Sequence, residues 1–167
     1  MFSAIDIAIW FILKNNAEVL EHEATNDDYE VYEGITHLKL QKLLYYAQGV
    51  CLAITGNTLF NEEIQAWQHG PVVAEVYDRF KENGRNNITI EIDENIKSNI
   101  RNIENNREIS EILNMVYDNF AIYTAWQLRE MSHVKNGPWD NAVSQGRKVI
   151  SIDDIRTYFE NEIVTDV

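Results

Sequence analysis

A long apolar stripe in the first third of the chain constrains the fold more than any other feature. Apolar side chains recur there at the spacing of one helix face. Thr36 is a suitable N-cap before the stripe, and Gly56 is placed to end the helix after it. The sequence therefore predicts a helix over residues 36–56 whose packing face consists of Leu40, Leu43, Leu44, Ala47, Val50, Cys51 and Ile54.

Gly49 interrupts this predicted helix. Glycine in a helix interior costs about 1 kcal/mol relative to alanine. We therefore expect another backbone or an aromatic ring to approach the helix at this position.

Other segments also carry helix signals. Ser3 and Asp6 form a capping-box pattern before a helix that we expect to end near Asn15. Pro71 suits the first position of a helix that Gly84 stops. Further helices are predicted after Asp93, over residues 109–120, after Thr124, after Gly137 and after Ser151.

Two short segments alternate between apolar and polar residues, which is typical of strands. They cover residues 64–68 and 88–92, and we expect them to pair with each other. The sequence thus predicts a mainly α fold, a compact helical bundle of about seven or eight helices with at most one small strand pair. The length of 167 residues fits a single domain over residues 1–167.

Composition favours a cytoplasmic protein that needs neither disulfide bonds nor a structural metal ion to fold. Hydrophobic residues make up 45% of the chain, and the lone cysteine excludes an intramolecular disulfide. The apolar N-terminus contains Asp6 and is shorter than the roughly 20 residues of a membrane span, and it lacks the basic start and cleavage site of a signal peptide. We therefore expect no membrane association.

The formal net charge of -13 constrains the partners. Such a charge repels phosphate backbones, so direct nucleic-acid binding is disfavoured. Residues 21–33 contain six acidic side chains and no lysine or arginine, which predicts a solvated loop or, alternatively, a docking loop for a basic partner. The candidate partner-binding residues of this loop are Glu23, Asp27, Asp28 and Glu30.

No local pattern predicts catalysis or a cofactor. Cys51 lies on the apolar stripe, where a thiol behaves as a small hydrophobic group. The four histidines lack the spacing of a metal site, and the seven glycines stand singly, without a phosphate-binding loop. The sequence predicts no catalytic residue, no metal site and no cofactor.

Two segments together resemble a known family. The first runs through residues 35–49 and continues to residue 72, and the second covers residues 132–139. Their order and spacing resemble the SocA-like antitoxins, also called the Panacea domain, which occur in phage-associated proteins. The resemblance extends over residues 3–159, although His69 replaces a usual aromatic residue and Ser132 a usual threonine. The matching residues are Leu40, Lys42, Leu43, Tyr45, Tyr46, Trp67, Gly70, Pro71, His133, Pro138 and Trp139.

The resemblance implies a non-enzymatic antitoxin that binds a cognate toxin directly, the toxin being encoded by an adjacent gene. It also implies that some relatives hand the toxin to a protease. The matching residues are expected to be mainly architectural, and the toxin-binding surface is expected elsewhere, on the acidic surface.

Two other functions stay open from the residues. The first is an acidic mimic or adaptor, phage-associated, that binds a nucleic-acid-binding or proteolytic protein of the host, which the charge of -13 motivates. The second is an enzyme that uses dispersed carboxylates together with His133.

Overall fold

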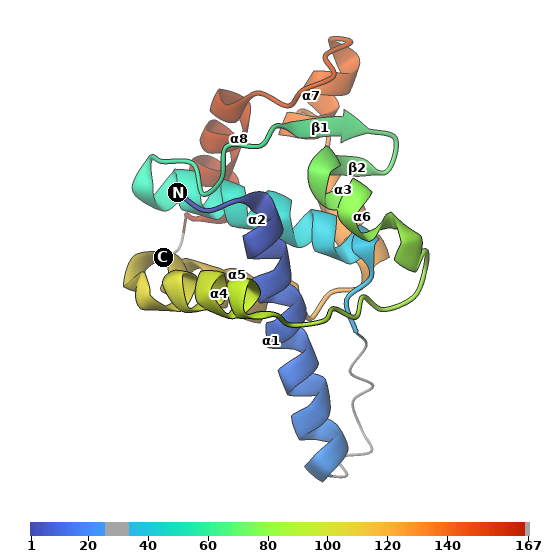
Figure 1. The fold of residues 1–167 in the computed structure, drawn as a ribbon. Coiled ribbons are helices and arrows are strands. Elements are labelled where there is room, and N and C mark those ends of the chain that lie inside the picture. The colour runs from blue at the N-terminus through green and yellow to red at the C-terminus, as the bar shows by residue number, and fades with distance from the viewer. Residues whose placement is uncertain (26–33, 166–167) are drawn as a thin grey trace.

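The structure, a computed structural model, describes residues 1–25 and 34–165. These residues form a mainly α fold with eight α-helices and one two-stranded sheet, as predicted (Figure 1). The elements are α1 (Ala4–Thr25), α2 (His37–Thr55), β1 (Ile64–Trp67), β2 (Gly70–Val73), α3 (Ala74–Phe80), η1 (Lys81–Asn83), α4 (Glu94–Asn105), α5 (Arg107–Phe120), α6 (Ala125–Ser132), α7 (Pro138–Ser144), α8 (Ile152–Tyr158) and η2 (Phe159–Ile163).

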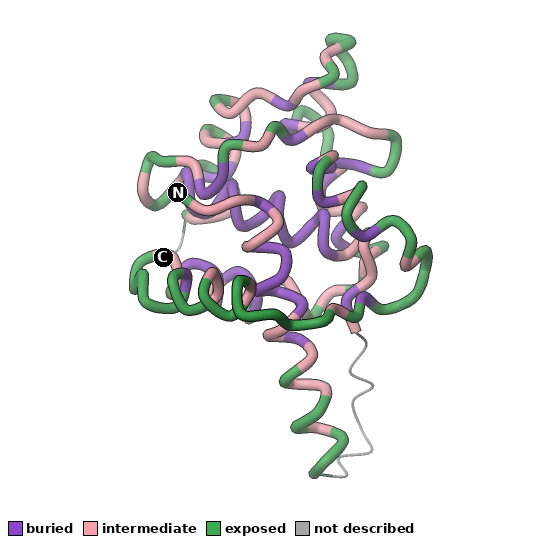
Figure 2. The backbone as a smooth tube through the Cα atoms, in the orientation of Figure 1, coloured by how far each residue is buried: buried purple, intermediate pink, exposed green. Residues whose placement is uncertain are grey.

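Helix α2 is the centre of the fold. Every residue from 40 to 52 is buried, including the polar ones (Figure 2). The helix packs against α1, α3, α5, α6, α8, β2 and η2. The predicted apolar stripe is therefore part of a helix that is covered on all sides over residues 40–52, whereas its last member, Ile54, is exposed, contrary to the prediction.

The capping residues that the sequence indicates are present. Thr36 accepts a hydrogen bond from the backbone N–H of Lys39 at 3.4 Å, and Gly56 ends α2 in the left-handed region with φ 74°. Thr124 and Gln127 form a reciprocal capping box at the start of α6. Local side-chain chemistry thus sets most helix starts.

The strand pair differs from the predicted one. β1 pairs antiparallel with β2, so that Ala66 faces Pro71. Pro71 lies in this strand, and α3 begins only at Ala74, so the prediction of Pro71 as the first residue of a helix was wrong. A proline without an N–H is tolerated at the edge of a sheet, and β2 has a strand on one side only.

Residues 88–92 form no strand, and their predicted pairing with β1 was wrong. A backbone hydrogen bond holds the chain there, in which the Ile88 N–H donates to the Ile35 carbonyl at 2.9 Å.

The edge of β1 that does not pair with β2 is joined to residues after α7. The Ala66 N–H donates to the Lys148 carbonyl, and the Ile150 N–H donates to the Ile64 carbonyl, both at 2.8 Å.

Helix α1 is ten residues longer than predicted and ends at Thr25 instead of near Asn15. The apolar spacing stops near Asn15, but no glycine or proline follows, so nothing breaks the helix. Its distal part extends beyond the packed body and is largely exposed (Figure 2). No helix in the described ranges has both the length and the apolarity that crossing a bilayer requires.

Gly49 supports the expectation of a close approach, because a Cβ added there would overlap the ring of Phe159. Alanine stabilises most helix interiors relative to glycine, by about 1 kcal/mol. Here we expect Gly49→Ala to lower the free energy of unfolding by about 1–3 kcal/mol, because the aromatic ring must shift. Chemical denaturation followed by circular dichroism measures the change.

Phe159→Leu supplies the control, since it removes the ring that the new methyl group meets. In that background Gly49→Ala should cost less than in the native chain. A stabilising effect of Gly49→Ala alone would contradict the close contact.

Candidate functional site

The residues of the two matching segments divide into a core group and a group around the β1–β2 hairpin. Leu40 and Leu43 are fully buried. Tyr45 and Tyr46 are buried in an aromatic cluster, in which the ring of Tyr46 stacks on Phe120 with centroids 4.1 Å apart. These residues hold α2 in place. Apart from Pro138, at the start of α7, the remaining matching residues form a group that we call the motif cluster, which consists of Lys42, Trp67, Gly70, Pro71, His133 and Trp139.

Two glutamines of α2 bind the backbone around the hairpin. The side-chain amide of Gln41 accepts a hydrogen bond from the Val73 N–H at 2.8 Å and donates one to the Val73 carbonyl at 3.3 Å. Gln48 accepts from the N–H groups of Leu59 and Phe60 and donates to the Phe60 carbonyl. Sequence reasoning assigned neither side chain a role. The available signal was their polarity, seven residues apart, inside an apolar helix.

Lys42 extends from the same helix to the hairpin. Its side chain is fully buried, and Nζ donates to the Pro71 carbonyl at 3.0 Å. Among the described residues it forms no ion pair. An ammonium has three donors, so one carbonyl satisfies it only in part. Burial, with a smaller contribution from the Arg129 guanidinium, lowers the pKa of Lys42 to about 7.

The second segment holds the hairpin from the other side. The His133 ring lies 3.8 Å from that of Trp139, and Trp139 Nε1 donates to the Trp67 carbonyl at 2.8 Å. Nδ1 of His133 is 2.6 Å from the Arg129 carbonyl, so Nδ1 carries a proton and caps the end of α6. Pro138, buried at the start of α7, fixes the turn that presents Trp139.

Gly70 is where the two segments meet. Its φ is 108°, a conformation that favours glycine. A Cβ there would lie 2.8 Å from Nζ of Lys42 and 3.0 Å from Cε1 of His133. The missing side chain therefore lets α2 and α6 contact the hairpin at the same point.

Basic side chains gather at the cluster in a strongly acidic protein. Lys42, Arg129 and His133 lie together, and burial is the largest cause that lowers the pKa of His133, with smaller additional lowering from Arg129 and Lys42. The carboxylate that pairs with a member of this group is Glu130, whose Oε1 is 2.6 Å from Nη1 of Arg129. These contacts assign the motif cluster a scaffold role and leave cationic groups at its edge.

The acidic candidates for partner binding are only partly described. Glu23 lies exposed in the last turns of α1, so the prediction of a loop was wrong for residues 21–25, which are helical. Asp27, Asp28 and Glu30 lie outside the described residues. Their role in binding stays a prediction.

Cys51 is buried in α2, and burial raises the pKa of its thiol. Within residues 1–25 and 34–165, no group of three or more histidine, cysteine or acidic side chains could hold a metal ion.

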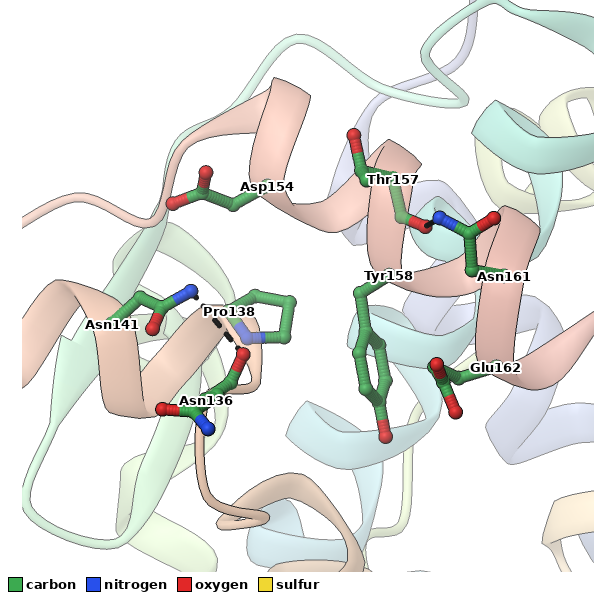
Figure 3. Close-up of a pocket in the computed structure, with 8 residues that line it drawn as sticks. All are labelled: Asn136, Pro138, Asn141, Asp154, Thr157, Tyr158, Asn161 and Glu162. Atoms are coloured by element: carbon green, nitrogen blue, oxygen red, sulfur yellow. Dashed lines mark hydrogen bonds between the residues drawn. The ribbon is translucent and has the colours of Figure 1, made fainter.

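One surface pocket lies apart from the motif cluster, between α7, α8 and η2 (Figure 3). Its cavity volume is about 270 Å³, and amide and carboxylate side chains dominate its lining. Ligand pockets are usually larger and mostly apolar. Asp154 at its rim is moreover paired with Arg147 at 2.7 Å, so we do not assign the function to this pocket. The lining residues are Asn136, Pro138, Asn141, Asp154, Thr157, Tyr158, Asn161 and Glu162.

The role of Gln48 can be tested by Gln48→Leu. The substitution keeps the approximate volume but leaves three buried backbone groups of Leu59 and Phe60 without their partner. We expect the free energy of unfolding to fall by about 2–3 kcal/mol. The exposed Gln145→Leu should change it by less than about 0.5 kcal/mol. Equal effects of the two substitutions in urea denaturation would contradict the assignment.

Lys42→Met tests the buried ammonium through pH. Below pH 7 the folded and unfolded states both bind the proton. Between pH 7 and 10.5 the unfolded chain keeps a proton that the folded chain has released, so the stability of the native chain rises with pH. Relative to Lys42→Met, it should rise by about 1 kcal/mol per pH unit from pH 7.5 to 9.5. A pH-independent difference in urea denaturation would show that the folded chain keeps the charge.

The region of the chain that resembles known proteins contains the motif cluster. A family model described as "Antitoxin SocA-like, Panacea domain" matches residues 40–140, a range that contains both segments of the cluster. The chain is also similar to "Antitoxin SocA" of Caulobacter vibrioides (strain NA1000 / CB15N), with 37% identity over 110 residues. This match covers 64% of the chain and 58% of the relative's own length. No solved structure matches the chain.

The family match covers more than half of the chain and every member of the motif cluster. The chain therefore belongs to the SocA-like antitoxin family, the Panacea domain family.

Proposed function

We propose that this protein is a cytoplasmic antitoxin that neutralises a cognate toxin, encoded by an adjacent gene, by binding it directly and without catalysis. The observation that carries the proposal is the family match over residues 40–140, which coincides with one connected cluster in the fold. The similar protein of Caulobacter vibrioides carries the name of an antitoxin as well.

The contacts of the cluster support binding over catalysis. Gln41, Gln48 and Lys42 are engaged with backbone groups of the hairpin and of the chain leading into it. His133 caps α6 and packs on Trp139. Side chains used in this way build a rigid frame for a protein surface.

We also propose to test whether the chain delivers the bound toxin to a protease. An adaptor of this kind would lower the amount of toxin, whereas a blocking antitoxin would leave the amount unchanged. The toxin level during neutralisation therefore distinguishes the two mechanisms.

The experiment is co-expression of the chain with the product of the neighbouring gene. We expect the neighbour alone to stop growth and the chain to restore it, with colony counts as the measurement and immunoblots reporting the toxin level. Arg107→Gln, at an exposed arginine of α5, should restore growth like the native chain. Leu44→Asp, which buries a charge in α2, should not.

A neighbour that is harmless alone, or equally lethal with and without the chain, would contradict the antitoxin function. Recovery of a host protein in place of the neighbour from a lysate would instead support the acidic mimic or adaptor.

A further inference from the structure

The exposed face of α6 combines features that the scaffold role does not explain. Trp126 is 62% exposed, and the guanidinium of Arg129 lies over its ring, 4.6 Å from the centroid. His133 follows one turn later, so the three side chains share one helix face. Tryptophan and arginine are the residues most often found at the energetic centres of protein interfaces.

The Arg129 guanidinium on this face is only partly paired. Nη1 donates to Oε1 of Glu130 at 2.6 Å, whereas the buried Nε has no partner within the described part of the chain. A guanidinium has five N–H donors, and the Arg129 side chain is 20% exposed, so an arriving carboxylate could add a second charged partner to it.

The segment that carries this face also differs from the rest of the chain in charge. Residues 119–149 contain four basic side chains, Arg129, Lys135, Arg147 and Lys148, against two acidic ones, Glu130 and Asp140, which gives +2 in a chain of -13. Of the eight large apolar side chains exposed in the described residues, four lie here: Ile122, Trp126, Val134 and Val143. A locally basic segment with exposed apolar side chains is complementary to a protein segment that pairs an apolar side chain with a carboxylate.

We propose that the α6 face formed by Trp126, Arg129 and His133 is the docking surface for the toxin, and that the Arg129 guanidinium donates hydrogen bonds to a carboxylate of the toxin there. This inference rests on the proposed antitoxin function. A nucleic acid fits the same donors poorly, because the net charge of -13 repels a polyanion but barely affects a single carboxylate.

The test measures the dissociation constant of the purified chain and the purified toxin by biolayer interferometry. Trp126→Ala and Arg129→Gln should each weaken binding about tenfold or more. Ile92→Ala and Arg107→Gln, which change an exposed apolar side chain and an exposed, carboxylate-paired arginine elsewhere, should stay within about twofold. Thermal unfolding checks each variant, and Trp126→Ala removes a side chain that is 62% exposed.

The carboxylate is tested by neutralising the acidic residues of the toxin one at a time, Asp→Asn or Glu→Gln. One substitution should weaken binding to the native chain but not to Arg129→Gln, the mark of a coupled pair. If no substitution couples to Arg129, the carboxylate assignment is overturned.

The possible failures are distinguishable. If the native chain binds the toxin and both α6 variants bind equally well, the docking surface is overturned while the antitoxin function stands. If the native chain neither binds the toxin nor restores growth, the antitoxin function is overturned and the docking surface with it.

Discussion

The fold depends on hydrogen bonds between polar side chains of the buried helix α2 and the backbone of the β1–β2 hairpin and of the chain that leads into it. α2 is covered on all sides, so the chain around it must bury peptide groups that the short β1–β2 sheet cannot pair. Gln41 and Gln48 provide these partners for Val73 and for the Leu59–Phe60 link, and Lys42 does so for Pro71. Their cost in an apolar core is offset because both sides of each bond are buried together.

This arrangement explains why segments about 90 residues apart belong to one pattern. α2 fixes the inner side of the hairpin, and Trp139, against which His133 packs, fixes the outer side through the carbonyl of Trp67. Both sides converge on Gly70, where a Cβ would meet Lys42 and His133. The pattern therefore describes a packing unit of three parts: α2, the β1–β2 hairpin and the segment that carries His133 and Trp139. Most of the matching side chains hold these three parts together.

Elements governed by local chemistry were predictable from the sequence, whereas those governed by tertiary contacts were not. The cap at Thr36 and the close approach at Gly49 follow from the residues themselves. Pro71 fits a helix start as well as an edge strand, and tertiary contacts hold it in the strand: the pairing of β2 with β1 and the bond from Lys42 to its carbonyl. Likewise, the alternation at residues 88–92 reflects burial of Ile88, not pairing. The residues of the site could be predicted from the sequence. The hydrogen-bond partners of Gln41, Gln48 and Lys42 could not, because these partners approach α2 only in the folded chain.

The packing around the hairpin also places buried basic groups behind the exposed face of α6, and a purely structural role does not require them. Replacing buried charged groups by apolar side chains of similar volume is often neutral or stabilising. Lys42 and Arg129 nevertheless lie close together, with Glu130 pairing only with Nη1 of Arg129, and Trp126 remains exposed above the Arg129 guanidinium. A partner that brings a second carboxylate would gain binding free energy from the remaining donors of Arg129, and the local positive charge would direct it to this face of an otherwise acidic molecule.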